Sequence, residues 1–145
     1  MSLAPLESSV FPNFVGTYQL NRVAALCFSA CELREFGKAF MSAVVINAKA
    51  LAGALEAEGF TIFGSKKGYT ETNQVLLQLP KEDGIGSAKK LEQINIICNE
   101  TITPGNTHTI SLRLSTTEIT RLGMGIKEMK TIAILIAARL KNREK

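Results

Sequence analysis

An arginine in the middle of a strand-like run is the residue whose setting most directly suggests chemistry. Arg113 lies between Leu112 and Leu114 and is followed at once by the small hydroxyl residues Ser115 and Thr116. An arginine in such a run is expected to point a fixed cation out of a sheet, and the planar guanidinium offers paired donors that match a carboxylate. The run therefore predicts a carboxylate-binding arginine. The alternative is a structural ion pair between Arg113 and a nearby acid.

Three other groups of residues are weaker candidates for chemistry. The glycine-rich turn Gly84–Lys89 lacks the third glycine of a dinucleotide fingerprint and the lysine-hydroxyl end of a nucleotide loop. Cys27 and Cys31 share a helix face, but without a nearby histidine or a second pair they are at most half a zinc site. We expect them to be small core residues. His108 is the single histidine and is expected to be a solvated loop residue. No metal site is predicted.

Composition limits the class of protein. The chain has 145 residues, of which 46% are hydrophobic, which is enough apolar material for one core and too little for two. Lys and Arg number 17 against 13 Asp and Glu, a formal net charge of +4, but the basic residues are scattered and aromatic residues make up only 6%. Nucleic-acid surfaces need clustered cations with stacking or groove-entering elements. We therefore expect one domain that does not bind nucleic acid.

Several sequence features bear on the location of the protein. No run of about 18 apolar residues is visible, so no membrane span is expected. The first residues lack a basic region followed by a sustained apolar core, so no secretion signal is expected. The three cysteines are an odd number and are expected to stay as thiols in a reducing compartment. These observations favour a cytoplasmic protein that does not bind a membrane.

Helical periodicity dominates the first part of the chain. After an extended lead-in, apolar residues recur every three or four positions, which predicts a helix with one stripe against a core. Phe36–Gly37 is a candidate interruption, and a second helix follows with Gly59 as its C-terminal stop. The stripe of the first helix comprises Leu20, Val23, Cys27, Ala30 and Cys31, and that of the second comprises Val44, Ala48, Leu51 and Leu55.

Beyond Gly59 the periodicity changes to that of strands. Thr61–Phe63 and Gln74–Leu79 are predicted strands, and Ser87 is a candidate cap for a short helix. The segment Thr101–Thr107 has the composition of a loop. Two further strands are predicted at Ile94–Cys98 and Thr109–Leu114, and a terminal helix at Ile126–Leu140 is expected to turn inward Met129, Ile132, Leu135, Ile136 and Leu140. This order predicts an α+β fold, with a small antiparallel or mixed sheet covered by helices on one side.

Four sequence landmarks occur in an order that is typical of one enzyme family. They are Ser9–Pro12, the run Asn47–Ala52 closing on Glu58–Phe60, the turn Gly68–Gln74 and the run Leu112–Met124. Together they resemble the C-terminal part of serine hydroxymethyltransferases, especially the archaeal-type enzymes, which are fold-type I pyridoxal-phosphate enzymes. The resemblance implies that residues 1–17 are an extended lead-in from a large domain and that residues 18–145 form the C-terminal small domain.

The resemblance also assigns roles to individual residues. Arg113 falls at the position of the family's arginine for the substrate carboxylate. Phe11 and Asn99 fall where the family lines its reduced-folate pterin site, although Phe11 as a core residue and Asn99 as a loop cap are the alternatives. Gly16 and Thr17 fall where a glycine pair reaches the cofactor phosphate of the neighbouring subunit. At Ser115 the chain departs from the family, which usually has glycine there.

The lysine that holds pyridoxal phosphate in this family is missing from the chain. Its motif lies upstream of the Ser9–Pro12 landmark, where this sequence begins. The resemblance therefore implies a fragment of a hydroxymethyltransferase. The full enzyme would use pyridoxal phosphate and a tetrahydrofolate-type pterin, whereas the fragment is expected to bind neither and to be inactive alone. The expected partners are the large cofactor domain and a second copy, because the first helices carry extra apolar residues: Leu26, Phe28, Leu33, Phe36, Phe40 and Met41.

Two other classes of function fit the same sequence. One is a free-standing, non-catalytic module that binds an amino acid or another carboxylate through Arg113 or mediates oligomerisation. The other is a purely structural subunit that completes a separate cofactor domain.

Overall fold

The structure is a computed structural model that describes residues 10–11, 16 and 19–141, apart from the side chains of residues 106–108. Its contacts divide the chain into two compact units, Met1–Gly37 and Lys38–Lys145, and each is described by itself. The predicted boundary between residues 17 and 18 lies outside the described residues.

One helix, α2 (Leu20–Ala57), occupies the region where two helices were predicted. No break occurs at Phe36–Gly37, although the two compact units divide directly after Gly37. The predicted core stripe of the first helix is wrong, because Leu20 is 74% exposed and both Cys27 and Cys31 are exposed. Burial of these side chains would need a packing layer that the described residues of this N-terminal unit do not supply.

The C-terminal half of α2 is a core helix of the second unit. Its buried residues follow the spacing of three and four that the sequence predicted, and they are Val44, Asn47, Ala48, Leu51, Ala52 and Leu55. Within the described residues, α2 is also the one helix that is long and apolar enough to cross a membrane by length and composition. Core helices pass the same test, and the buried face of this half favours that interpretation.

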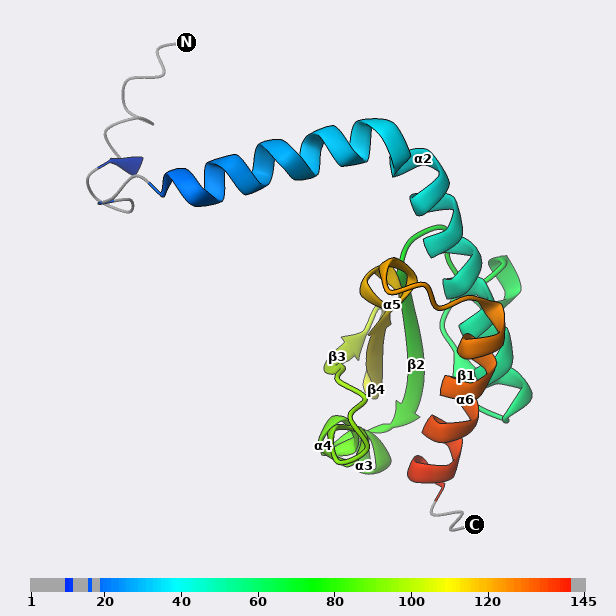
Figure 1. Cartoon of the computed structure of the whole chain (residues 1–145). Coiled ribbons are helices and arrows are strands. Elements are labelled where there is room, and N and C mark those ends of the chain that lie inside the picture. Colours follow the sequence, from blue (N-terminus) through cyan, green and yellow to red (C-terminus); the bar gives the residue numbers. More distant parts are fainter. Residues whose placement is uncertain (1–9, 12–15, 17–18, 142–145) are drawn as a thin grey trace. The chain divides into compact units, whose positions relative to one another are not determined.

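The second unit contains a four-stranded sheet in the order β1-β2-β4-β3, with antiparallel neighbours throughout. The strands are β1 (Thr61–Ile62), β2 (Gln74–Pro80), β3 (Asn99–Thr103) and β4 (Asn106–Ser115). In Figure 1 the C-terminal half of α2 and α6 (Ile126–Leu140) lie against one face of this sheet. The predicted α+β class with a small antiparallel sheet is confirmed.

The third strand lies later in the sequence than predicted. Ile94–Cys98 is not a strand, and Ile97 in it is 87% exposed. The predicted loop instead contains the end of β3, a tight turn at Pro104–Gly105 and the start of β4. The turn fixes the register of this hairpin, because Gly105 takes a positive φ of 75° that suits a glycine. His108 consequently belongs to β4 and not to a loop.

Short helical segments complete the unit, and of these only α4 was predicted. The unpredicted ones are α3 (Lys81–Gly84), α5 (Thr117–Arg121) and η1 (Ser65–Lys67), which is a single 3-10 turn. In α4 (Ser87–Glu92) the cap is Gly86, and Ser87 is a buried first residue whose hydroxyl donates to Asp83 O. The prediction that Ser87 caps this helix is therefore wrong.

The core lies between the sheet and the long helices. β2 contributes Val75, Leu77 and Leu79, and β4 contributes Leu112 and Leu114. From α6 the core receives Met129, Ala133, Ile136 and Ala137, whereas Leu135, predicted to face inward, is 49% exposed because the helical repeat turns it away from the buried neighbours at 133 and 136–137. Gly84 also serves packing, because a Cβ there would lie 2.6 Å from Ile110 Cβ.

Candidate functional site

Arg113 stands on the sheet face opposite the core. Leu112 and Leu114 are buried on one face of β4, and the alternation of a strand directs Arg113 to the other, where it is exposed. β4 is an inner strand, so the Arg113 backbone is flanked by Leu76 of β2 and by Asn99 of β3. The strand therefore fixes the base of the guanidinium side chain on both sides.

A hollow of about 890 Å³ surrounds Arg113, and we call it the Arg113 hollow. Its walls come from β4, the start of β2, α5, the segment before β3 and one residue of α2. The lining residues are Phe40, Asn73, Gln74, Asn95, Ile97, Cys98, Asn99, Arg113, Ser115, Thr117, Glu118, Ile119, Arg121 and Leu122. The lining thus combines amides, hydroxyls and the Arg113 guanidinium with apolar side chains such as Ile97 and Leu122, and its donors suit a small polar anion.

Within the described residues, Arg113 makes no hydrogen bond and no ion pair with another side chain. The ion pair in this part of the chain joins Lys49 and Glu71 on the α2 side. The alternative of a structural ion pair for Arg113 therefore finds no partner among the described acids. Among the described residues, nothing occupies the donors of the guanidinium.

The structure brings together two of the predicted site residues, Asn99 and Arg113. Asn99 is the register partner of Arg113 across the β3–β4 pair, and both line the Arg113 hollow. Phe11, which is 49% exposed, and Gly16, which is also exposed, belong to the N-terminal unit. Thr17 lies outside the described residues.

The strand end after Arg113 is held by buried hydrogen bonds. The Thr116 side chain is fully buried, and its hydroxyl donates to Val44 O at 3.0 Å. The Thr116 amide donates to Asn73 O at 3.1 Å, and Asn73 Nδ2 donates to Ser115 Oγ at 2.8 Å. Ser115, where the family usually has glycine, thus ties the rim of the Arg113 hollow to the residue before β2.

Asn47 holds the far side of α5. Its side chain is 4% exposed, and Nδ2 donates to Thr120 Oγ1 and to Met124 O, each at 2.9 Å. Thr120 Oγ1 in turn donates to Thr116 O at 2.6 Å. Sequence reasoning placed Asn47 in a family landmark but assigned it no role. The available signal was an amide between the core positions Val44 and Leu51 of an apolar helix stripe.

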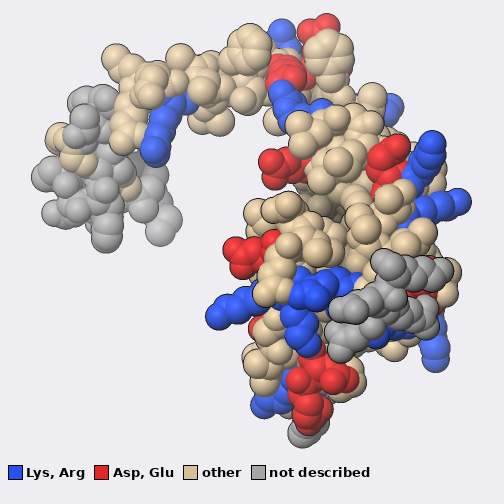
Figure 2. Space-filling view, turned by 60° about the horizontal axis from the view of Figure 1, so that its bottom comes forward, with Lys and Arg blue, Asp and Glu red and all other residues tan. Residues whose placement is uncertain are grey.

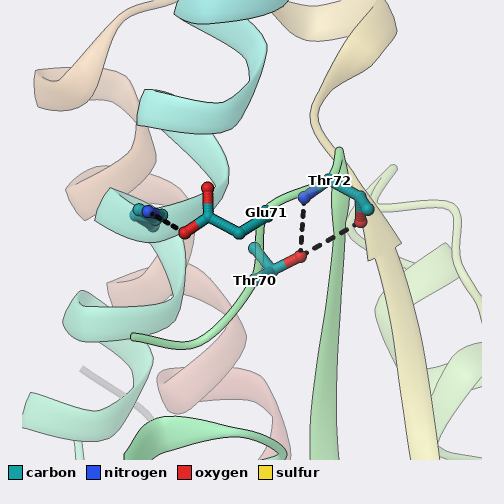
Figure 3. A network of polar contacts seen from close by, with 4 residues as sticks. Thr70, Glu71 and Thr72 are labelled. Carbon is teal, nitrogen blue, oxygen red and sulfur yellow. Dashed lines mark hydrogen bonds and ion pairs between the residues drawn. The ribbon is translucent and has the colours of Figure 1, made fainter. Parts of the chain in front are cut away.

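The turn that leads into β2 is also tied to α2. Figure 3 shows Thr70 Oγ1 accepting from the Thr72 amide at 3.0 Å, while the Glu71 carboxylate faces the other way and pairs with Lys49 Nζ at 2.6 Å. Nearby, Tyr69 donates its hydroxyl to Glu56 Oε2 at 2.6 Å, and this bond to a carboxylate raises the tyrosine pKa. The turn precedes Asn73 and Gln74, so it positions one wall of the Arg113 hollow.

Cys98 is the thiol of the Arg113 hollow. Burial, with a smaller contribution from the Glu100 charge, raises the pKa of Cys98 to about 11. A thiol with such a pKa is protonated near neutrality and is a poor nucleophile. Cys98 therefore contributes shape to the site and no covalent chemistry.

The lining of the Arg113 hollow does not fit a pyridoxal-phosphate site. Such a site needs a lysine to hold the cofactor, and the described lining contains no lysine. Nor do the described residues bring together three or more side chains that could hold a metal ion. The chain offers an anion-binding arginine, and a cofactor would have to be held by other residues.

Comparisons with known proteins indicate the family of the chain. The family model for serine hydroxymethyltransferase matches residues 3–136. Among curated relatives, the serine hydroxymethyltransferase of Methanopyrus kandleri is 42% identical over 91% of this chain and 32% of its own length. That of Pyrobaculum aerophilum is 40% identical over 96% of this chain and 33% of its own length. The chain therefore spans about a third of the length of these curated relatives.

A solved structure has the same fold. The L-threonine transaldolase of Pseudomonas fluorescens, solved in its internal aldimine state, superposes with a TM-score of 0.75 and 27% identity, over 79% of this chain and 26% of that enzyme. The likeness covers a small part of a much longer enzyme, which is consistent with a C-terminal domain. With the family model matching most of its length, the chain belongs to the serine hydroxymethyltransferase family.

Proposed function

We propose that this chain is the C-terminal small domain of a serine hydroxymethyltransferase, which interconverts serine and glycine with a tetrahydrofolate-type carrier. Its part in that reaction is to bind the substrate carboxylate through Arg113. The observation that carries this proposal is a guanidinium that lines a hollow and has no partner among the described residues. Family membership supports the reaction class.

The arginine serves the reaction by orienting the amino acid. Two parallel N–H donors on a carboxylate fix both its distance and its rotation, which a single ammonium cannot do. Because β4 is bonded on both sides, this anchor starts from a rigid base. A fixed carboxylate holds the rest of the amino acid in one orientation toward the cofactor, and such positioning lowers the barrier of the following step.

Asn99 is the residue of this chain that we propose for the pterin. An amide offers one donor and one acceptor, which complement the paired groups on a pterin edge. Its place opposite Arg113 lets a single wall of the hollow contact both ligands. We propose the same pterin role for Phe11 in the N-terminal unit, and contact with the neighbouring subunit's cofactor phosphate for Gly16 and Thr17.

The partners we propose are the large cofactor domain and a second copy of the protein. The support is apolar surface on α2, where Leu26, Phe28, Leu33, Phe36 and Met41 are exposed. Phe40, the remaining member of the predicted set, is instead half-buried and lines the Arg113 hollow. Exposed apolar surface of this kind usually marks a site where a protein partner binds.

Basic and acidic side chains lie interspersed on the face shown in Figure 2, and we propose a cytoplasmic protein that does not bind nucleic acid.

A chimeric enzyme tests the function. This chain replaces the matching third of the Methanopyrus kandleri relative, and the formation of glycine from serine and tetrahydrofolate is measured. We expect activity in the chimeric enzyme and none in the 145-residue chain or in the relative without its matching third. A folded chimeric enzyme that binds pyridoxal phosphate but forms no glycine would contradict the proposal, and turnover by the chain alone would contradict its dependence on a cofactor domain.

A further inference from the structure

The wall that α5 adds to the Arg113 hollow is too short to hold its own position. α5 has five residues, and Thr117, Glu118 and Arg121 on it line the hollow. An isolated helix of this length is not stable in water, because nucleation costs more than so few bonds return. The distance between this wall and Arg113 must therefore be set by contacts from outside α5.

Two of those contacts come from one amide on another element, beside the bonds of Thr116 to Val44 O and Asn73 O and the packing of Ile119 against the core. Asn47 of α2 uses both hydrogens of Nδ2, one for Thr120 Oγ1 and one for Met124 O. The first bond reaches the last turn of α5, and the second reaches the chain just beyond it. The bond to Thr120 spans 73 positions of sequence, so it couples the core helix to the wall directly.

We propose that Asn47 is a positioning residue for the carboxylate site, an inference that rests on the proposed function of Arg113. Asn47 is not among the residues that line the Arg113 hollow, so it acts through Thr120 and α5. By holding α5 at a fixed distance from β4, it keeps the hollow at the width that a carboxylate needs. The effect on ligands is therefore specific to the carboxylate end.

The chemistry of the site requires an amide in particular. Aspartate has nearly the same shape, but it replaces the donor Nδ2 with an acceptor oxygen, which would face both Met124 O and Thr120 Oγ1 without a hydrogen to donate. A buried carboxylate without donors is strongly unfavourable, so it would push α5 away or unfold the domain. Thr120→Val is the milder change, because it keeps the side-chain shape and removes one hydroxyl, which accepts from Asn47 Nδ2 and donates to Thr116 O four residues earlier.

The test uses variants of the chimeric enzyme and two competitive ligands. Glycine carries a carboxylate, while glycinamide has the same amine without the negative charge. Asn47→Asp and Thr120→Val are compared with Thr131→Val, a matched control on α6. The exposed Thr131 hydroxyl donates to Lys127 O at 3.3 Å, also four residues earlier, and Thr131 lies outside the hollow's lining. Arg113→Lys reports separately on the proposed function.

We expect Thr120→Val and Asn47→Asp to lower the affinity for glycine about tenfold and to change the affinity for glycinamide less than about twofold. Thr131→Val should change neither. Equal weakening of both ligands, or unchanged binding of glycine, would overturn the inference while a glycine-specific loss in Arg113→Lys kept the proposed function. An Arg113→Lys enzyme that binds glycine normally would overturn both.

A second measurement covers the case in which Asn47→Asp does not fold. Amide hydrogen exchange of residues 117–124 is followed in the 145-residue chain carrying Thr120→Val. We expect faster exchange there and unchanged exchange in α6. Unchanged protection of residues 117–124 would show that the Asn47 bond does not hold this wall, and would overturn the inference.

Discussion

Replacing Arg113 by lysine separates ligand binding from folding. Arg113 is exposed and has no bonded partner among the described residues, so Arg113→Lys should change the free energy of unfolding by less than about 0.5 kcal/mol. Binding should respond very differently. An ammonium keeps the charge but cannot form two parallel bonds to a carboxylate, and the loss of such a charge-assisted pair is expected to cost about 2–4 kcal/mol.

That free energy corresponds to an affinity about 30- to 900-fold lower, since each 1.36 kcal/mol is a factor of ten. The assay is the dissociation constant of glycine and kcat/KM for serine in the chimeric enzyme, with urea unfolding of each variant measured in parallel. The dissociation constant of glycine should rise and kcat/KM for serine should fall, while the unfolding midpoint stays where it was.

Arg139→Lys is the matched control with the opposite expectation. Arg139 Nε donates to Lys90 O at 3.1 Å and so links α6 to α4, away from the Arg113 hollow. Losing this bond should lower the free energy of unfolding by about 1 kcal/mol and leave glycine binding unchanged. Should Arg113→Lys bind glycine as the unaltered enzyme does, or lose stability as Arg139→Lys does, Arg113 would be a structural residue and the reasoning would be refuted.

Three further predictions follow from burial and from pKa shifts. Iodoacetamide should modify Cys98 far more slowly than the exposed Cys27 at pH 8, with the Cys98 rate rising as the pH approaches its pKa of about 11; equal rates at pH 8 would contradict this. Leu112→Ala, at a fully buried position, should lower the free energy of unfolding by about 2–5 kcal/mol. Ile102→Ala on the same hairpin, where the side chain is 68% exposed, should stay within about 0.5 kcal/mol in the same denaturation experiment. The Glu128 carboxylate accepts the backbone N–H of Gly125, the residue that caps α6, and this bond lowers the pKa of Glu128. The stabilising effect of the ionised Glu128 is therefore fully present above the ordinary glutamate pKa and is lost as the pH falls through the lowered pKa. The difference in melting temperature between the unaltered chain and Glu128→Gln should therefore shrink on acidification, and a constant difference would count against this.

Local patterns predicted the elements that depend on local signals. The bounds of α6 are those expected, and β1 and β2 lie where alternation placed them. The register of β3 was missed because the isoleucines before it satisfy a strand pattern equally well. The turn at Pro104–Gly105 decides between the segments Ile94–Cys98 and Asn99–Thr103, because it closes a hairpin only if pairing starts at Asn99.

In the candidate site too, local sequence predicts some features, while contacts between distant residues decide others. Arg113 was predictable, since a cation within an apolar run is a local anomaly. The width of its hollow was not, because it depends on Asn47 and Thr120, two residues that are far apart in sequence. The first helix stripe was misjudged for a related reason, since periodicity shows that Leu20 and Cys27 share a face but does not show what covers it.

The place of Arg113 on an inner strand has a consequence for how this site can change in evolution. Its backbone is bonded to strands on both sides, whereas α5 and the segment before β3 are short and can accept substitutions without disturbing the sheet. Descendants of such a domain can therefore acquire new preferences for the side-chain end of an amino acid by altering these walls. If Arg113 binds the substrate carboxylate as proposed, enzymes with different side-chain substrates would still share this one anchor.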